Sequence, residues 1–251
     1  MTVSYANRFQ DPTAVAAYDA QEYGAGSYSS RVWQWQRPVV EQLLRDFRAQ
    51  RPGPVRLLDF ACGTGRVLTA VAPLVNQAVG VDISAGMAAV ARTKCPGAEV
   101  RVGNILTEPA LLPEKNFDVI SCFRFVLNAE PDLRGRVLRR LRAALAADGQ
   151  LLVNVHGNAH SLRHPAIAWK RRRTAAPDAM LNEMTPGEAR EMLHAAGFIV
   201  VRQFGFGILP PTFYRSPLRG LAEAVDRSLA GDHWWRNSAI DMLFVCRRGN
   251  K

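Results

Sequence analysis

The sequence is short of cysteine, and its few cysteines are not spaced for a metal or for a disulfide framework. No two of them form a CxxC pair, the spacing typical of zinc sites. Their scatter along the chain also argues against a disulfide-stabilised scaffold. We therefore expect no metal site and reduced, mostly buried thiols at Cys62, Cys95, Cys122 and Cys246.

Long apolar runs are also missing. The longest ones fall far short of the roughly 20 residues that a membrane-spanning helix requires. No opening stretch joins a basic segment to an apolar one, as a secretory signal does. We expect a cytoplasmic protein without a membrane span.

Lysine is rare, whereas arginine is abundant. Only four of the 32 basic residues are lysines, and the net charge is +10. Such a balance suits binding to phosphates, anionic sugars or nucleic acid. It is also typical of a genome whose codon usage favours arginine and alanine, which is the plainer explanation.

From residue 55 onward, short apolar segments alternate with segments of helical periodicity. This alternation predicts βαβ units in a parallel sheet with right-handed crossovers. Helices are expected at 65–75, 84–94 and 132–147, with Asp148-Gly149 ending the last of them. Seven strands are expected, at 55–60, 78–83, 98–103, 117–123, 150–156, 198–207 and 240–248.

A helical segment precedes this α/β pattern and a less regular one interrupts it. Asp11-Pro12 is a helix-start signal, and a longer helix is expected over 29–49, kinked or divided at Pro38. Thr185 caps the start of a later helix. We expect a single domain over 1–251 that consists of an N-terminal helical cap (1–52), a core (53–156), a lid or insertion (157–184) and the C-terminal part of the sheet with the substrate region (185–251).

The stretch LLDFACGTGR (57–66) places two glycines directly after an expected buried strand. Glycines let a ligand approach the backbone closely, and the following helix offers its N-terminal amides. Asp82 ends the next strand, where an acid is well placed to hold ribose hydroxyls. The spacing that binds a pyrophosphate is absent, and so is the P-loop lysine. The loop therefore favours a ligand with a ribose but without a diphosphate.

From about residue 30 to residue 248, the chain resembles the class I S-adenosylmethionine (SAM)-dependent methyltransferases. LLDFACGTG is similar to their glycine-rich motif, GVDIS (80–84) to the second motif, GNI (103–105) to the third, and FDVISCF with Arg124 to the fourth. The resemblance implies a Rossmann-like, doubly wound α/β fold with seven mostly parallel strands and an antiparallel last strand. It also implies SAM as cofactor and S-adenosylhomocysteine (SAH) as product.

The resemblance also assigns roles to single residues. Asp82 is implied to grip the ribose, Met87 to pack on the adenine, and Asn104 to stand where an acid commonly bonds to the adenine amine. Ala61 replaces the first glycine of the motif, a position that we expect to need a small side chain more than a positive φ. The residues implied to bind the cofactor are Asp59, Ala61, Gly63, Gly65, Asp82, Ile83, Met87, Asn104, Ile105 and Phe123.

The acceptor pocket is expected outside the carboxyl ends of the strands. His156 follows the fifth strand and is the candidate general base, since histidine titrates near neutral pH. The alternative is a histidine that bonds to the loop backbone. The basic run 170–173 after Trp169 either binds phosphates or forms a solvated face. Candidate acceptor-binding residues are Arg124, His160, Tyr23 and Tyr28.

We expect SAM-dependent methyl transfer to a small-molecule acceptor, at oxygen, by in-line displacement. The acceptor is expected to be anionic, a sugar or an aromatic compound. An RNA methyltransferase that uses the basic surface is the first alternative, and a non-catalytic SAM-binding module is the second. A nicotinamide dehydrogenase is a more remote one, because Asp82 suits it but the loop spacing does not.

Overall fold

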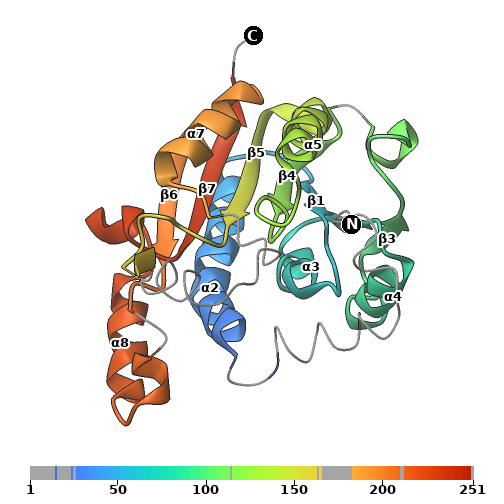
Figure 1. Ribbon diagram of the computed structural model, residues 1–251. Helices are drawn as coiled ribbons and strands as arrows, with labels where there is room; N and C mark the ends of the chain where they lie inside the picture. Colours follow the sequence, from blue (N-terminus) through green and yellow to red (C-terminus); the bar gives the residue numbers. More distant parts are fainter. Residues whose placement is uncertain are drawn as a thin grey trace, which may run out of the picture.

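The computed structural model describes residues 15, 24, 27–113, 115–162, 164–165, 183–209 and 212–249. They contain a seven-stranded sheet of order β3-β2-β1-β4-β5-β7-β6 (Figure 1). The strands are β1 (Arg56–Phe60), β2 (Gln77–Asp82), β3 (Glu99–Val102), β4 (Phe117–Cys122), β5 (Leu145–Val155), β6 (Phe198–Phe206) and β7 (Asp241–Arg248).

Six strands point the same way, and only β7 runs antiparallel to them, between its neighbours β5 and β6. This confirms the predicted Rossmann-like, doubly wound sheet. The strand order reverses between β1 and β4, and in open α/β sheets ligands bind outside the carboxyl ends of the strands at such a point. The glycine loop follows β1 at this place.

Helices cover both faces of the sheet. They are α2 (Tyr28–Ala49), α3 (Arg66–Val71), α4 (Ala85–Lys94), α5 (Pro131–Ala144), α7 (Pro186–Ala195) and, at the edge beyond β6, α8 (Arg219–Leu229) (Figure 1). Short 3-10 turns are η2 (Ala72–Leu74), η3 (Pro109–Leu111), η4 (Phe213–Arg215) and η5 (Trp234–Asn237).

Alternating strand residues divide the core between the two faces, because successive side chains of a strand point to opposite sides. Leu58 and Val153 pack in one apolar cluster with Leu138 of α5 and with α7. Their neighbours Leu57 and Leu152 pack in another cluster with α2. All four cysteines are free and buried, as predicted.

Two local predictions were wrong or incomplete. Helix α5 ends at Ala144, and Asp148-Gly149 lies within β5 instead of ending the helix. A Cβ at Gly149 would lie 2.8 Å from the Asp118 carbonyl oxygen, so this glycine permits the close approach of β4 at a register shift. Pro38 does not divide α2. A proline leaves the carbonyl of the residue four positions earlier, here Gln34, without its helical hydrogen-bond partner, and both residues lie on the exposed face of the helix.

The start of α7 has the predicted capping. The Thr185 hydroxyl accepts from the Glu188 amide, and the Glu188 carboxylate accepts in return from the Thr185 amide, which satisfies two donors of the first turn. Helix α8 was not predicted. The expected helix over 11–23 and the run 170–173 with Trp169 lie outside the described residues, apart from Val15. In the described part of the chain, no helix combines the length and apolar character needed to cross a bilayer.

Candidate functional site

The loop after β1 bends through three residues with positive φ: Ala61 (+54°), Gly63 (+54°) and Gly65 (+81°). The expectation that this position needs a small side chain more than a positive φ was therefore incomplete, because Ala61 adopts the left-handed conformation, which costs roughly 1–2 kcal/mol. A methyl group added at Gly63 would meet nothing within 4 Å. The space above the loop is thus open to a ligand. At Gly65, by contrast, a Cβ would lie 3.1 Å from Ala91, so α4 packs closely there.

Asp82, at the end of β2, is bonded to the glycine loop. Its carboxylate accepts from the Gly63 amide at 2.8 Å and from the Ser84 amide at 2.9 Å. Burial raises the pKa of Asp82, while these amide bonds oppose the rise. The side chain therefore fixes the loop relative to the second strand, next to an open cavity.

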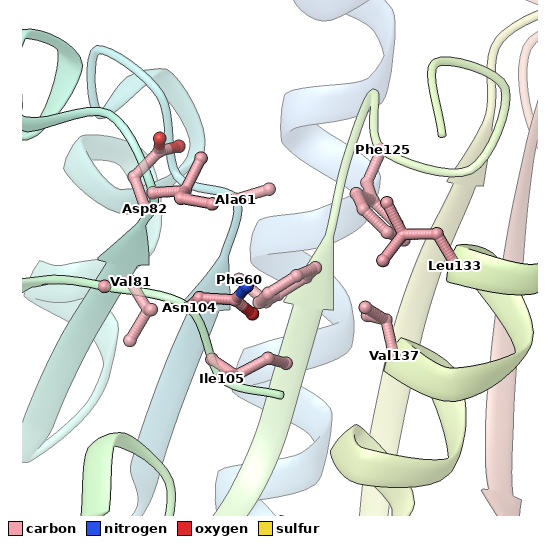
Figure 2. A pocket seen from close by; sticks show the side chains of 11 residues that line it. Phe60, Ala61, Val81, Asp82, Asn104, Ile105, Phe125, Leu133 and Val137 are labelled. Carbon is pink, nitrogen blue, oxygen red and sulfur yellow. The ribbon is translucent and has the colours of Figure 1, made fainter. Parts of the chain in front are cut away.

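This cavity is mainly apolar and lies between β2, the loop after β3 and α5. Figure 2 shows the Phe60 and Phe125 rings in its wall, with Leu133 and Val137 of α5 on one side and Asp82 at its far end. The Asn104 side chain accepts from the Leu106 amide at 3.0 Å. A nucleobase, which is flat, largely apolar and polar along one edge, fits such a lining. The full lining is Phe60, Ala61, Val81, Asp82, Ile83, Gly103, Asn104, Ile105, Phe125, Leu133 and Val137.

A second, more polar cavity lies on the other side of the glycine loop. It is lined by Asp59, Ala61, Cys62, Gly63, Thr64, Arg66, Val67, Phe123 and Arg124. Asp59 is buried and accepts from the Ser121 hydroxyl at 2.7 Å. Burial raises the pKa of Asp59 to about 7, against the lowering effects of Ser121, Arg66 and the Leu68 amide. The two cavities share Ala61 in their linings and therefore lie next to each other.

Arg124 follows β4 and is held in a left-handed conformation, with φ +59°. Its amide donates to Asn154 Oδ1 at 3.3 Å, and its carbonyl accepts from Asn128 Nδ2. Non-glycine residues in this conformation cost about 1–3 kcal/mol and cluster at functional sites. The described residues contain three non-glycine residues with a positive φ. Two of them, Ala61 and Arg124, line the second cavity.

A buried polar network, which the sequence analysis did not single out, lies next to Arg124. Asp241, at the start of β7, accepts from Gln36 Nε2 of α2 at 2.7 Å and from Asn154 Nδ2 of β5. Burial raises the pKa of Asp241 to about 7, while Arg124 and the two amides lower it. A signal was available: Asn154 interrupts an apolar strand, and Asp241 begins another.

His156 lies directly after β5, among arginines. Burial, and then the charges of Arg124, Arg66 and Arg134, hold the pKa of His156 well below its usual range. Its Nδ1 is buried and has no hydrogen-bond partner among the described residues. The imidazole is therefore neutral at physiological pH, and the same effects make it a weaker base than an unperturbed histidine. Through Nδ1 the ring makes no bond to the loop backbone, and the role of His156 as a base stays a prediction.

Three other predicted residues, Met87, Tyr28 and His160, do not line either cavity. Met87 is buried in the first turn of α4, where its amide donates to Ser84 Oγ. The Tyr28 ring packs edge-on to Tyr214. His160 is exposed, and Tyr23 falls outside the described residues. In the described ranges, no group of three or more His, Cys, Asp or Glu side chains is placed to hold a metal ion.

Comparisons with known proteins agree with this geometry. Residues 32–203 match the family described as "Methyltransferase domain". The dTDP-4-amino-2,3,4,6-tetradeoxy-D-glucose N,N-dimethyltransferase of Saccharopolyspora spinosa is 31% identical over 149 residues, or 57% of this chain and 54% of that protein. The malonyl-acyl-carrier-protein O-methyltransferase of Methylococcus capsulatus is 29% identical over 138 residues, or 54% of this chain and 49% of that protein. The chain thus spans about half the length of these curated relatives.

A solved structure shares the fold over almost the whole chain. The magnesium protoporphyrin IX methyltransferase of Synechocystis, solved with bound SAH, superimposes with a TM-score of 0.62 at 15% identity. The match covers 95% of this chain and all of that one. Because the family match covers more than half of the sequence, the chain belongs to the methyltransferase domain family, as a member of its class I, SAM-dependent type.

Proposed function

We propose that this chain transfers the methyl group of SAM to an oxygen atom of a small-molecule acceptor. The observation that carries the proposal is the pair of cavities that share Ala61, one apolar and one polar, whose lining residues Asp82 and Gly63 are bonded to each other. In this proposal Ile83, Asn104 and Ile105 hold the adenine, Asp82 the ribose, and Asp59, Gly63, Gly65 and Phe123 surround the methionine part.

When bound, SAM supplies a methyl group on a positively charged sulfur, which is a strong electrophile. The chain then has to align the acceptor with that methyl group, because alignment alone removes much of the barrier to an in-line displacement. An acceptor hydroxyl also has to lose its proton. We assign this proton to His156 Nδ1, which is buried without a partner in the described residues and belongs to a neutral ring.

Transfer to an amine is the second candidate. It is favoured by the relative from Saccharopolyspora spinosa, an N,N-dimethyltransferase that is 31% identical over the matched residues. The relative from Methylococcus capsulatus is an O-methyltransferase. The buried, partnerless nitrogen of His156 favours oxygen in our proposal, since a neutral amine can attack before it loses a proton.

Calorimetric titration with SAH, with NADH as the control ligand, tests the cofactor. Incubation of the protein with tritiated SAM and either small-molecule extracts or RNA then tests the acceptor. We expect SAH binding in the micromolar range, no NADH binding, and label in the small-molecule fraction. Label in RNA would favour an RNA methyltransferase, and SAH binding without any transfer would favour a non-catalytic module. Base hydrolysis of the labelled product distinguishes a methyl ester from an ether or a methylamine.

A further inference from the structure

The side chain of Asn104 is fixed by the loop that follows β3. Its Oδ1 accepts from the Leu106 amide at 3.0 Å, so the side chain closes a turn onto the backbone two residues further along the chain. If the amide group were turned over, its NH2 would face this N–H, and the N–H would lose its acceptor. The oxygen therefore faces the loop, and the NH2 group takes the opposite place.

The backbone of Asn104 is also committed to this loop. Its amide donates to Glu108 Oε1 at 2.9 Å, and its carbonyl accepts from the amides of Thr107 at 3.1 Å and Glu108 at 2.9 Å. Gly103 leaves room for the Glu108 carboxylate, because a Cβ at Gly103 would lie 2.8 Å from Oε2. Nδ2 is thus the one polar atom of Asn104 that bonds to none of the described residues.

Asn104 lines the first cavity, which the proposed function assigns to the base of the cofactor. Asp82 and Asn104 are the only polar side chains in the lining of this cavity. Figure 2 shows Asp82 at one end of the cavity and Asn104 lower in the view, next to Ile105. With the ribose at Asp82, the edge of the base that faces away from the ribose, which carries the 6-amino group of adenine, has Asn104 as its polar side-chain partner.

An amide and a carboxylate act differently at this position. An aspartate has two oxygens, so one could hold the Leu106 amide while the other accepts from the 6-amino group. Asparagine has one oxygen, which the loop uses, and offers a donor to the cavity. Two donors that face each other form no hydrogen bond, whereas a donor that faces an oxygen at position 6 of the base forms one.

We propose that Asn104 turns its NH2 group toward the exocyclic position of the base, so that the cavity does not select for a 6-amino group and also binds a purine with an oxygen at position 6. This inference rests on the proposed binding of SAM in the first cavity. It makes Asn104 a specificity-determining residue that reads position 6 through a donor.

Calorimetric titration with SAH and with S-inosylhomocysteine, in which an oxygen replaces the 6-amino group, tests the inference. The second ligand also carries a proton on ring nitrogen N1, but this difference is the same for every variant and cancels when the ratio of the two affinities is compared between variants. We expect the unmodified protein to bind both ligands.

Asn104→Ser removes the NH2 group, while the serine hydroxyl can still accept from the Leu106 amide. The ratio of SAH affinity to S-inosylhomocysteine affinity should then rise about tenfold, which corresponds to about 1.4 kcal/mol, because only the 6-oxo base loses a bond. If Oδ1 instead accepted from the 6-amino group, only SAH would lose a bond and the ratio would fall. The direction of the change therefore decides between the two orientations.

Asn104→Asp is a second variant of nearly the same shape, which keeps the test available if the serine loosens the loop. It places an acceptor where the NH2 group was, so SAH gains a bond and the 6-oxo base meets an oxygen. The ratio should rise about a hundredfold. The titrations are run at pH 8, because the Glu108 and Asp82 carboxylates nearby would raise the pKa of the new carboxyl.

Asn76→Ser and Asn76→Asp are the matched controls. Asn76 is exposed, its Oδ1 accepts from the Val55 amide at 2.9 Å, and it precedes β2 at the sheet edge opposite to the cavity. Neither control should change the ratio. A fall of the ratio in Asn104→Ser, an unchanged ratio in Asn104→Asp, or SAH binding without S-inosylhomocysteine binding in the unmodified protein would overturn the inference. Absence of SAH binding to the unmodified protein would instead refute the proposed function.

Discussion

Replacing Asp82 with alanine is expected to weaken SAH binding about a hundredfold. In the proposed complex its carboxylate receives hydrogen bonds from the ribose hydroxyls, and bonds to a charged group contribute about 1.5–3 kcal/mol each. Two such bonds amount to roughly 3 kcal/mol or more, which is at least a hundredfold in the dissociation constant. The same change leaves the Gly63 amide without the acceptor that it has at 2.8 Å, so the loop also loses its anchor.

The free protein should be affected less than the complex. Burial raises the pKa of Asp82, which means that the ionised carboxylate is costly in this place. Alanine removes this cost together with the two amide bonds, and the opposing effects leave a small change in the melting temperature. The rise in melting temperature on adding SAH should fall by much more, since it depends on affinity.

Calorimetry and thermal unfolding, run on the same preparations, measure both quantities. Asp232→Ala is the control, because Asp232 is an exposed acid paired with Arg236 and its loss removes the same charge. In the unmodified protein, SAH affinity should also fall as the pH is lowered through the raised pKa of Asp82, because a protonated carboxyl accepts hydrogen bonds poorly. If the SAH affinity of Asp82→Ala stays within a factor of about three of that of the unmodified protein, the assignment of the ribose to this residue is refuted.

Further changes test other parts of the site. His156→Ala should lower kcat about 10²- to 10⁴-fold with little change in SAH affinity, as expected for loss of a general base, and equal turnover would remove that role. Asp241→Asn should remove a pH dependence of stability. The pKa of Asp241 rises from 3.8 in the unfolded chain to about 7 in the fold, so between these pH values the folded state binds one more proton than the unfolded state. The contribution of Asp241 to ΔG of unfolding therefore declines by about 4 kcal/mol as the pH rises through this range. The variant should therefore gain stability relative to the unmodified protein between pH 4 and 7 in denaturant titrations, and parallel curves would contradict this. Thr185→Ala should cost about 1 kcal/mol through the lost cap of α7, whereas Thr185→Ser should cost little.

The parts of the site that lie within a short stretch of chain were predictable from the sequence. The glycine loop and Asp82 are 17 residues apart, counted from Gly65, and both follow from local rules about strands, turns and ribose recognition. The left-handed conformation of Ala61 was not predictable in this way, because alanine normally avoids it. Such a conformation persists only where the surrounding structure holds it.

The buried network around Arg124 required the tertiary structure. Gln36 and Asp241 are 205 residues apart, and no local pattern pairs a helix residue in the N-terminal part with the first residue of the last strand. The Asp148-Gly149 prediction failed for a related reason. This pair is a common helix stop, but here Asp148 pairs with Arg51 and Gly149 makes room for β4. In both cases a contact between distant segments overrides the local signal.

The position of β7 has a consequence for how the chain is made. This strand comes last in the sequence, yet it lies between β5 and β6. During synthesis on the ribosome, β5 and β6 emerge first, and their edges stay unpaired until residues 241–248 have left the exit tunnel. Unpaired strand edges invite aggregation. A premature stop before Asp241 would leave one edge of β5 open, β6 without its neighbour in the sheet, and Gln36 and Asn154 without their shared carboxyl, so we expect such fragments to be targets for chaperones and proteases rather than weakly active enzymes.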